Sequence, residues 1–289
     1  VYDDLGNYEK AIVNYSKALE INPKLVEAQN NLIHILNYYL PKNVNLNPIL
    51  VANAKLRNLK NNIISKEHID TSDISIFFKN CNEIIKNNIK ELAFYETQIF
   101  RRNTIDLNCK RHHKVFNKFD IIPKFCFSCY KVQIEPHNVL ELFKLFFVFD
   151  NLNLPLNNTR KCTIELRPEI SGTYKGLIYC SSLLEAKKVL SLINPTIKKN
   201  LSSKTKMVIR RGCSEFGISY PKYKETNKNE DMLMKYNKSW EIKEKIIDEE
   251  ILKESKKRKR IINESLRGLS VNDILVMNNW LNYAKNIND

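Results

Sequence analysis

Cysteine and histidine residues at short spacings are the features of this sequence that could do chemistry. Cys109 and His112 form a C-x2-H pair, and Cys126 and Cys129 form a C-x2-C pair. Two ligands at this spacing on a tight turn can reach one tetrahedral ion. Thiolate and imidazole ligands suit zinc, and four thiolates would equally suit an iron–sulfur cluster. The alternative is that these are buried, reduced cysteines, because bulky Phe127 replaces the small or basic residue expected inside such a pair.

The spacing of apolar residues along the sequence predicts the strands and helices that must position these residues. Alternation predicts strands at 130–135, 160–167, 173–180 and 206–211, and helical spacing predicts helices at 137–151 and 183–192, the second ended by Asn194-Pro195. The order strand, helix, strand, strand, helix, strand is the split βαβ arrangement of a ferredoxin-like sandwich. Right-handed crossovers then give the sheet order fourth, first, third, second. The expected fold class is therefore α+β, with helical hairpins preceding this sandwich and helices following it.

This topology brings cysteines that are distant in sequence to one rim of the sheet. We expect Cys126 and Cys129 at the start of the first strand, Cys162 near the start of the second, Cys180 at the end of the third and Cys213 after the fourth. Neighbouring strands lie about 4.8 Å apart, so adjacent pairs could share a metal. The predicted metal ligands are Cys109, His112, Cys126, Cys129, Cys180 and Cys213.

Thiol catalysis is a weaker alternative. Cys213 follows Arg210 and Arg211, whose positive charges would lower the pKa of the thiol and make it a better nucleophile. No Ser, Cys or carboxylate stands at a recognisable spacing from the other candidate bases, which are His34, His113 and His137. We therefore assign no catalytic residue from the sequence.

The first 40 residues carry a helical pattern of a different kind. Apolar and small residues at three- and four-residue steps predict a helix from Tyr8 that ends at Asn22-Pro23, followed by a second helix from about Leu25 to Tyr39. The first run resembles the second helix of a tetratricopeptide repeat, and the next helix resembles the first helix of the following repeat. The residues at the family's signature positions are Gly6, Tyr8, Ala11, Tyr15, Ala18, Leu19 and Pro23.

This resemblance implies a concave groove that binds a protein or peptide. By the resemblance Asn30, His34 and Asn37 would face that groove, although each could equally be a solvated helix position. Such repeats normally occur in threes or more, so further repeats are expected before residue 1.

The rest of the chain divides by composition. We expect a repeat region at 1–40, a helical cap or linker at 41–100, the cysteine-containing sandwich at 101–225 and a charged helical region at 226–289. Helices are predicted at 49–64 and 74–89, with Cys81 in the core, and the run 256–260 resembles a nuclear-localisation or nucleic-acid segment within a charged helix.

Nucleic acid is an alternative partner. The chain of 289 residues has a net charge of +15, which fits either nucleic-acid binding or the Lys-, Asn- and Ile-rich composition of an AT-rich genome. The third strand resembles that of RNA-recognition domains at Lys175, Gly176 and Tyr179, but Leu177 and Ser182 stand where stacking aromatics are expected.

The composition further limits the class of protein to which the chain can belong. The sequence lacks a glycine-rich phosphate loop and an apolar run long enough to cross a bilayer, and its scattered cysteines suit the reducing cytoplasm. The expected function is that of a protein-interaction scaffold. A nucleic-acid-binding module and a thiol- or metal-dependent enzyme are the alternatives.

Overall fold

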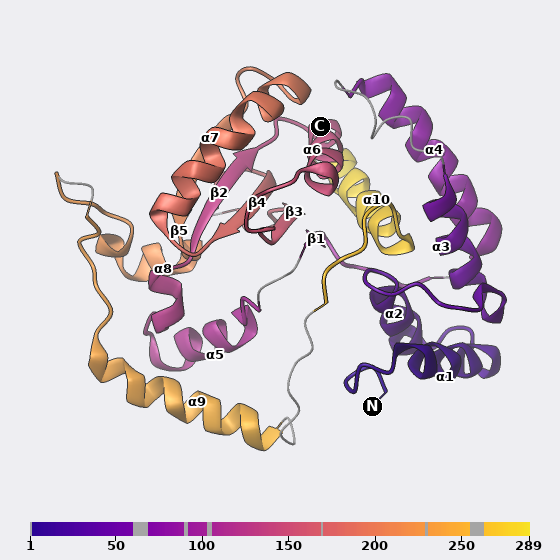
Figure 1. Ribbon diagram of the computed structural model, residues 1–289, viewed down its shortest axis with the longest axis horizontal. Helices are drawn as coiled ribbons and strands as arrows, with labels where there is room; N and C mark the ends of the chain where they lie inside the picture. The colour runs from indigo at the N-terminus through magenta and orange to yellow at the C-terminus, as the bar shows by residue number, and fades with distance from the viewer. Residues whose placement is uncertain are drawn as a thin grey trace.

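A mixed helix-and-strand architecture is built around one antiparallel sheet. The computed structural model describes residues 2–59, 69–89, 92–102, 106–168, 170–228, 231–254 and 263–289. The strands are β1 (Gln98–Arg101), β2 (Tyr130–Glu135), β3 (Arg160–Ile164), β4 (Tyr174–Cys180) and β5 (Lys206–Arg211). They lie in the order β1-β3-β4-β2-β5, with antiparallel neighbours throughout (Figure 1). The expected α+β class is confirmed, and β2 to β5 have the order derived from crossover handedness.

Four helices form the N-terminal part, which lies at one side of the sheet (Figure 1). They are α1 (Tyr8–Ile21), α2 (Val26–Ile35), α3 (Pro48–Asn58) and α4 (Thr71–Asn88), with a 3-10 turn at Val44–Leu46 between α2 and α3. The hairpin of α1 and α2 buries Ile12 and Leu32 completely. Side chains cap the later helices, because Asn47 accepts a hydrogen bond from the backbone N–H of Ile49 and Asp70 accepts one from Ser72.

Two helices cover one face of the sheet, α6 (Val139–Asn151) and α7 (Leu183–Asn200). Alternation along the strands places Val132, Ile134 and Ile178 on this face, where all three are fully buried. Gly176 allows α6 to approach β4, because a Cβ at this position would lie 2.3 Å from Cδ2 of Leu145. We call the opposite side, which neither helix covers, the open face.

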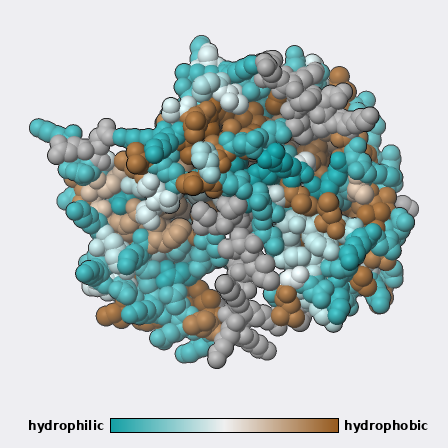
Figure 2. Space-filling view, viewed as in Figure 1, coloured by the Kyte–Doolittle hydropathy of each residue, from teal (hydrophilic) through white to brown (hydrophobic). Residues whose placement is uncertain are grey.

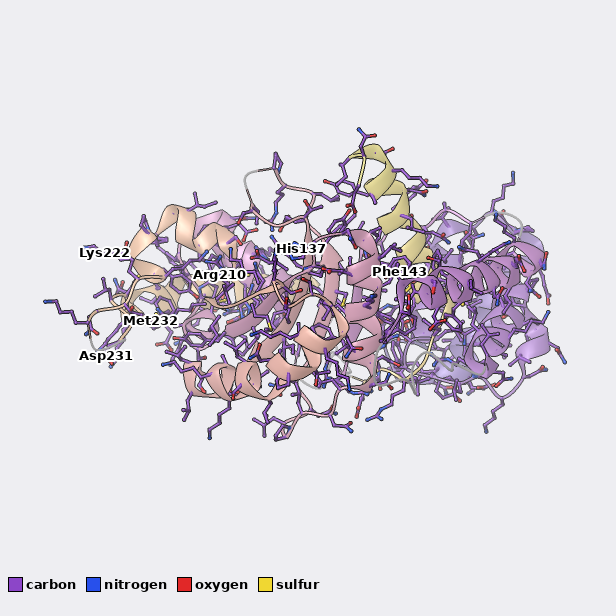
Figure 3. All side chains as sticks on the ribbon, turned by 90° about the horizontal axis from the view of Figure 1, so that it is seen from above. His137, Phe143, Arg210, Lys222, Asp231 and Met232 are labelled. Atoms are coloured by element: carbon purple, nitrogen blue, oxygen red, sulfur yellow. The ribbon has the colours of Figure 1, made fainter. Side chains whose placement is uncertain are left out.

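Helix α10 (Val271–Asn286) joins the N-terminal helices to the sheet. It packs against α2, α3, α4, α6 and β1. The fully buried indole of Trp280 lies 6.0 Å from the ring of Phe143 and donates a hydrogen bond to the carbonyl of Thr97 at 2.8 Å. Phe143 in turn lies 5.0 Å from Phe78 of α4, at the junction seen in Figure 3. One continuous core therefore extends from α1 to α7.

A smaller unit lies at the other end of the molecule. It consists of α5 (Cys109–Phe119), α8 (Ser214–Ser219), α9 (Glu241–Glu254) and the 3-10 turns Lys124–Phe127, Pro221–Tyr223 and Lys238–Trp240. Arg111 holds α5 to α9 through Glu244 at 2.5 Å and Asp248 at 2.7 Å. A separate hydrophobic cluster around Phe216 and Tyr223 supports this unit. In Figure 3, Lys222 and Asp231 mark this end, opposite the N-terminal helices.

Three sequence predictions need correction. The pattern does not predict β1, since its four residues carry too short an alternation. Helix α7 does not end at Asn194-Pro195 but continues to Asn200, because Ile193 and Ile197 are fully buried on the same stripe. Helix α2 ends at Ile35 rather than near Tyr39, and a turn follows it. The helix predicted at 49–64 ends at Asn58, where Leu59 is its C-cap residue, and the helix predicted at 74–89 extends from Thr71 to Asn88. The basic run at 256–260 lies outside the described residues.

Candidate functional site

A large cavity lies against the open face of the sheet. Its volume is about 2750 Å³, and its walls come from the open face, α5, α2 and the segment around Asn263 and Ser265. The surface seen in Figure 2 is mostly hydrophilic, with hydrophobic side chains confined to small patches. The side chains that line the cavity include Asn30, His34, Asn37, Cys109, His113, Lys131, Lys161, Lys175, Tyr179 and Cys213. Its lining also contains carboxylates, those of Asp3, Asp4, Glu96, Asp106, Glu165, Glu215 and Glu250.

Three lysines from three adjacent strands project from the open face. Lys175 of β4 is buried and forms an ion pair with Glu165 at 3.2 Å. Lys161 of β3 donates a hydrogen bond to the side-chain oxygen of Gln98 at 3.2 Å, and its ammonium lies 5.4 Å from the centre of the Phe100 ring. Burial, with the charge of Lys131 beside it, lowers the pKa of Lys161 to about 8.

Lys131 of β2 has its ammonium 6.0 Å from the centre of the Tyr179 ring. Within the described part of the chain, neither Lys131 nor Lys161 has a carboxylate within ion-pair distance. The open face therefore holds two ammonium groups that the chain's described carboxylates do not neutralise.

Cys213 and His113 form a second feature of the cavity. Cys213 follows β5, and His113 reaches it from α5. Burial by itself would raise the pKa of the Cys213 thiol, but the charge of Lys131 and a hydrogen bond from His113 outweigh burial and lower this pKa to about 7. A large fraction of Cys213 is therefore thiolate at neutral pH, which is the nucleophilic form of cysteine.

The cause of this lowered pKa differs from the sequence expectation. Arg211 is directed away from Cys213, with its guanidinium 5.0 Å from the centre of the Phe127 ring and 4.7 Å from that of Tyr223. It donates hydrogen bonds to backbone carbonyls of that hydrophobic cluster. His113 could not be recognised as a partner from the sequence, because it lies 100 positions from Cys213 and only the packing of α5 brings the two together.

The predicted rim exists as a backbone feature. Tyr130 pairs with Cys180 on one side and with Arg211 on the other, and the N–H of Gly212 donates to the carbonyl of Cys129 at 2.8 Å. Cys162 is an exception, and that part of the prediction was wrong. It pairs with Gly176 in the middle of β3 and is buried on the helix-covered face.

The predicted metal ligands are brought together only in part, since Cys109, Cys126 and Cys129 each lie near enough to Cys213 for its charge to raise their pKa. No group of three or more His, Cys, Asp or Glu residues that could hold a metal ion occurs among the described residues. Cys180 belongs to the main core, whereas Cys126 belongs to the smaller cluster with Phe216. Cys213 also packs against this smaller cluster, so Cys180 is the predicted ligand that the alternation of faces places in a different core.

The surroundings of the remaining predicted ligands favour their neutral forms. His112 is buried and its ring stacks on Phe125 at 5.1 Å, where burial lowers its pKa to about 4. Burial likewise raises the pKa of Cys129 to about 11. Cys109 lines the cavity, and burial raises the pKa of its thiol as well. These environments favour neutral thiols and a neutral imidazole packed against protein. The metal site stays a prediction, with Cys109, Cys126, Cys129 and Cys213 as the ligands that lie near one another.

The three residues expected to face a groove all line the cavity. The Oδ1 atom of Asn30 is buried and has no hydrogen-bond partner among the described residues. His34 packs edge-on against Tyr38 at 5.5 Å. Asn37 already contacts the chain itself, since its Oδ1 accepts a hydrogen bond from Ser270 at 3.1 Å and its carbonyl accepts one from Leu266 at 2.8 Å. Asn37 therefore holds the C-terminal segment in place, a role that the sequence pattern did not indicate.

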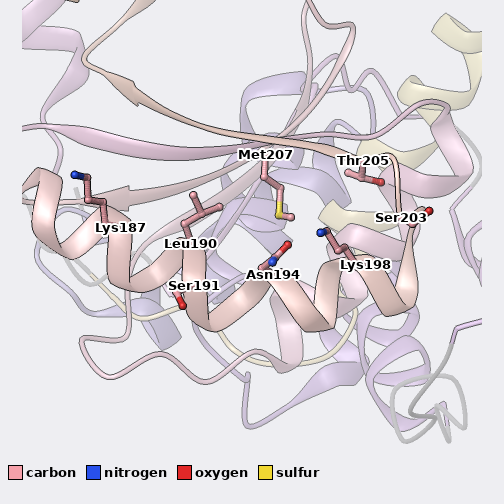
Figure 4. A pocket seen from close by; sticks show the side chains of 8 residues that line it. All are labelled: Lys187, Leu190, Ser191, Asn194, Lys198, Ser203, Thr205 and Met207. Carbon is pink, nitrogen blue, oxygen red and sulfur yellow. The ribbon is translucent and has the colours of Figure 1, made fainter. Parts of the chain in front are cut away.

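A second, smaller hollow lies between α7 and β5 (Figure 4). Its volume is about 470 Å³, and Lys187, Asn194 and Met207 are among the residues that line it. Its described lining contains neither cysteine, histidine nor a carboxylate. It therefore lacks the groups that make the larger cavity a candidate for chemistry or recognition.

Comparison with known proteins identifies the N-terminal hairpin. A family model described as a TPR repeat matches residues 1–32, which include α1 and most of α2. No curated protein and no solved structure matches the chain. Across the described ranges, every helix is too short or too polar to cross a bilayer.

Proposed function

We propose that this protein is an interaction scaffold, because it contains a tetratricopeptide repeat at its N-terminal end. It binds an extended segment of a partner protein in the cavity between α2 and the open face of the sheet. The observation that carries this proposal is that Asn30 and His34, on the groove side of the repeat, line the same cavity as the strands. The repeat and the α+β part would thus form one binding surface.

The size and lining of the cavity support a peptide rather than a small molecule. Small-molecule pockets usually occupy about 300–1,000 Å³, and this cavity is larger at about 2750 Å³. The unpaired Oδ1 of Asn30 adds a second argument, because a buried acceptor without a donor is unfavourable. A partner that supplies a donor to this amide would relieve that cost.

The order of β2 to β5 and their two covering helices supports the ferredoxin-like interpretation of the second part. This fold hosts many functions, so the proposal rests on the cavity and not on the fold. The seven free cysteines fit a cytoplasmic location for such a scaffold.

Peptide selection on the immobilised whole chain tests the proposal. Peptides from a random displayed library would be isolated, and their affinity measured by calorimetry for the parent, Asn30→Ala and His34→Ala. We expect each change to weaken binding about 5- to 10-fold, which corresponds to one lost hydrogen bond or packing contact. Asn14→Ala is the matched control, since Asn14 is exposed on α1 outside the cavity. Equal affinities for all four proteins would overturn the proposal.

Thiol chemistry is a second candidate function, favoured by the lowered pKa of Cys213 at the cavity wall, to which Lys131 and His113 both contribute. A cysteine with an adjacent base is the arrangement used by thiol nucleophiles. Turnover of a thioester or ester substrate that disappears in Cys213→Ser would support it, and turnover that is unchanged in this variant would exclude Cys213 as the nucleophile.

A further inference from the structure

The unneutralised lysines on the open face indicate what kind of partner segment the cavity takes. The carboxylates nearest to them on the sheet are already committed. Glu165 binds Lys175 at 3.2 Å and Arg167 at 2.8 Å. Lys131 and Lys161, which both line the cavity, thus have no described carboxylate of the sheet as an ion-pair partner.

Glu135, at the end of β2, is also engaged. It accepts a hydrogen bond from Gln133 at 2.6 Å and lies 3.4 Å from the ammonium of Lys206. Apart from the thiolate of Cys213, whose pKa their charges lower, Lys131 and Lys161 therefore depend on water or on a ligand for their counter-charge. Because Lys161 is half-buried and lies near Lys131, water compensates these two charges less well than it would at an exposed surface.

We propose that Lys131 and Lys161 form a subsite for the acidic side chains of a partner peptide, which lies across the open face and continues toward α2. This inference rests on the proposed scaffold function and names the chemistry of its partner. Its basis is charge complementarity, because carboxylates are the groups that two adjacent unpaired ammonium ions attract most strongly.

The geometry favours a peptide over single-stranded nucleic acid. Nucleic-acid surfaces of this kind need free aromatic faces on which bases stack. Here Lys161 lies over Phe100 and Lys131 lies over Tyr179, so these two ring faces are occupied by the ammonium groups themselves. Both cations are lysines, which act as point charges and lack the planar fork that reads phosphates and bases. The same cavity also includes the repeat, whose family binds proteins.

Fluorescence anisotropy with a labelled octaglutamate peptide tests the subsite on the full chain. Lys131→Gln combined with Lys161→Gln is compared with Lys17→Gln combined with Lys188→Gln, two exposed lysines outside the cavity whose replacement removes the same net charge. We expect the first pair to weaken octaglutamate binding at least 10-fold and the control pair to change it less than 2-fold. Octaglutamine should bind neither protein measurably.

Two results would overturn the inference. One is an equal loss of affinity in both pairs, which would mean that octaglutamate responds only to net charge. The other is tighter binding of a labelled thymidine octanucleotide than of octaglutamate, with the larger loss in Lys131→Gln plus Lys161→Gln, which would assign the face to nucleic acid. Lys131→Gln alone provides a milder variant if the double change unfolds the chain, as circular dichroism would show.

The failure of this inference can be told apart from failure of the scaffold proposal. Peptides selected on the whole chain that lose affinity in Asn30→Ala but not in the lysine pair would leave the scaffold intact and reject the acidic subsite. Selected peptides that are insensitive to Asn30→Ala and His34→Ala would reject the scaffold, whatever octaglutamate does.

Discussion

The guanidinium of Arg101 and the carboxylate of Asp273 form a two-pronged ion pair in the interior of the molecule. Nη2 of Arg101 lies 2.7 Å from Oδ2 of Asp273, and Nη1 lies 3.2 Å from Oδ1. Asp150 adds a contact of 2.6 Å to Nε of the same arginine, and all three side chains are buried. Burial alone would lower the pKa of Arg101, but these carboxylates hold it above its usual value. The pair ties β1, at the edge of the sheet, to the start of α10.

Asp273→Ala should strongly destabilise the protein. Removal of one partner leaves the buried charge of Arg101 undercompensated, which typically costs about 3–5 kcal/mol. The change also removes the capping box that Asp273 forms with Ser270 at the start of α10. The free energy of unfolding in urea measures the effect. Glu241→Gln is the control, because its partner Lys245 lies 3.5 Å away on an exposed helix surface and such pairs contribute about 0.5 kcal/mol or less. Similar losses in the two variants would show that burial of the ion pair is not what matters.

Gly176→Ala should destabilise the packing of α6 on β4. The new Cβ would lie 2.3 Å from Cδ2 of Leu145 and 3.0 Å from Cζ of Phe149, both in the core. Overpacking of this kind costs about 1–3 kcal/mol. The double variant Gly176→Ala with Leu145→Ala should lose less free energy of unfolding than the two single variants lose in sum. The reason is that the shortened side chain at position 145 makes room for the new methyl group.

A comparison site separates this steric effect from backbone strain. Gly268 has a φ of +82°, and a Cβ added there would meet no atom within 4 Å. Gly268→Ala therefore tests the strain of the left-handed backbone alone, and we expect it to lower the free energy of unfolding by about 1–2 kcal/mol. Only the Gly176 variant should respond to Leu145→Ala. Strict additivity of Gly176→Ala and Leu145→Ala would contradict the predicted clash.

Cys213 should be alkylated before the other cysteines. At pH 7 about half of a thiol with a pKa near 7 is ionised, whereas burial raises the pKa of Cys129 to about 11 and that of Cys180 to about 12. The rate of modification by iodoacetamide, followed by mass spectrometry of digested protein, should rise with pH and reach its midpoint near pH 7.

His113→Gln provides the check on that prediction. Loss of the histidine should raise the pKa of Cys213 and move the midpoint of the rate profile to higher pH, because a hydrogen bond to the thiolate disappears. His137→Gln should leave the profile unchanged, since His137 follows the end of β2 whereas Cys213 lies beside its start. A midpoint near the ordinary value for cysteine in the parent protein would show that the site does not activate Cys213.

Lys161→Met should stabilise the protein at neutral pH. The pKa of Lys161 is about 8 in the folded chain and 10.5 at its ordinary value, so the unfolded chain binds more protons between these pH values. Lys161 therefore lowers the free energy of unfolding most below about pH 8, and this effect becomes smaller as pH rises toward 10.5. The free energy of unfolding of Lys161→Met should exceed that of the parent most at pH 7 and progressively less toward pH 10. A difference that does not vary with pH would refute the predicted titration.

Much of the fold follows from local pattern. The period of the apolar residues identified β2 to β5, and the handedness of the crossovers gave their order. The signature residues around Tyr8 and Pro23 identified the repeat, which the family match confirms. These features depend on short-range spacing or on general chirality, which a single sequence contains.

The candidate site is less predictable because it depends on long-range packing. His113 reaches Cys213 only through the placement of α5, and the lysines share one face because of strand register. The cysteines of the rim divide between two hydrophobic clusters, because neighbouring side chains alternate between faces and the packing of the smaller unit is not encoded locally. Pro195 lies inside α7 because tertiary burial outweighs the local tendency of proline to end a helix.

Helix α10 has a consequence for synthesis of the chain on the ribosome. A nascent polypeptide that still lacks Val271–Asn286 has made α3, α4 and α6, but the apolar surfaces that receive Trp280 and Ile274 have no cover. The N-terminal helices therefore cannot complete their packing until α10, which begins about two hundred residues after α3, has been translated. During that interval these surfaces are natural targets for chaperones.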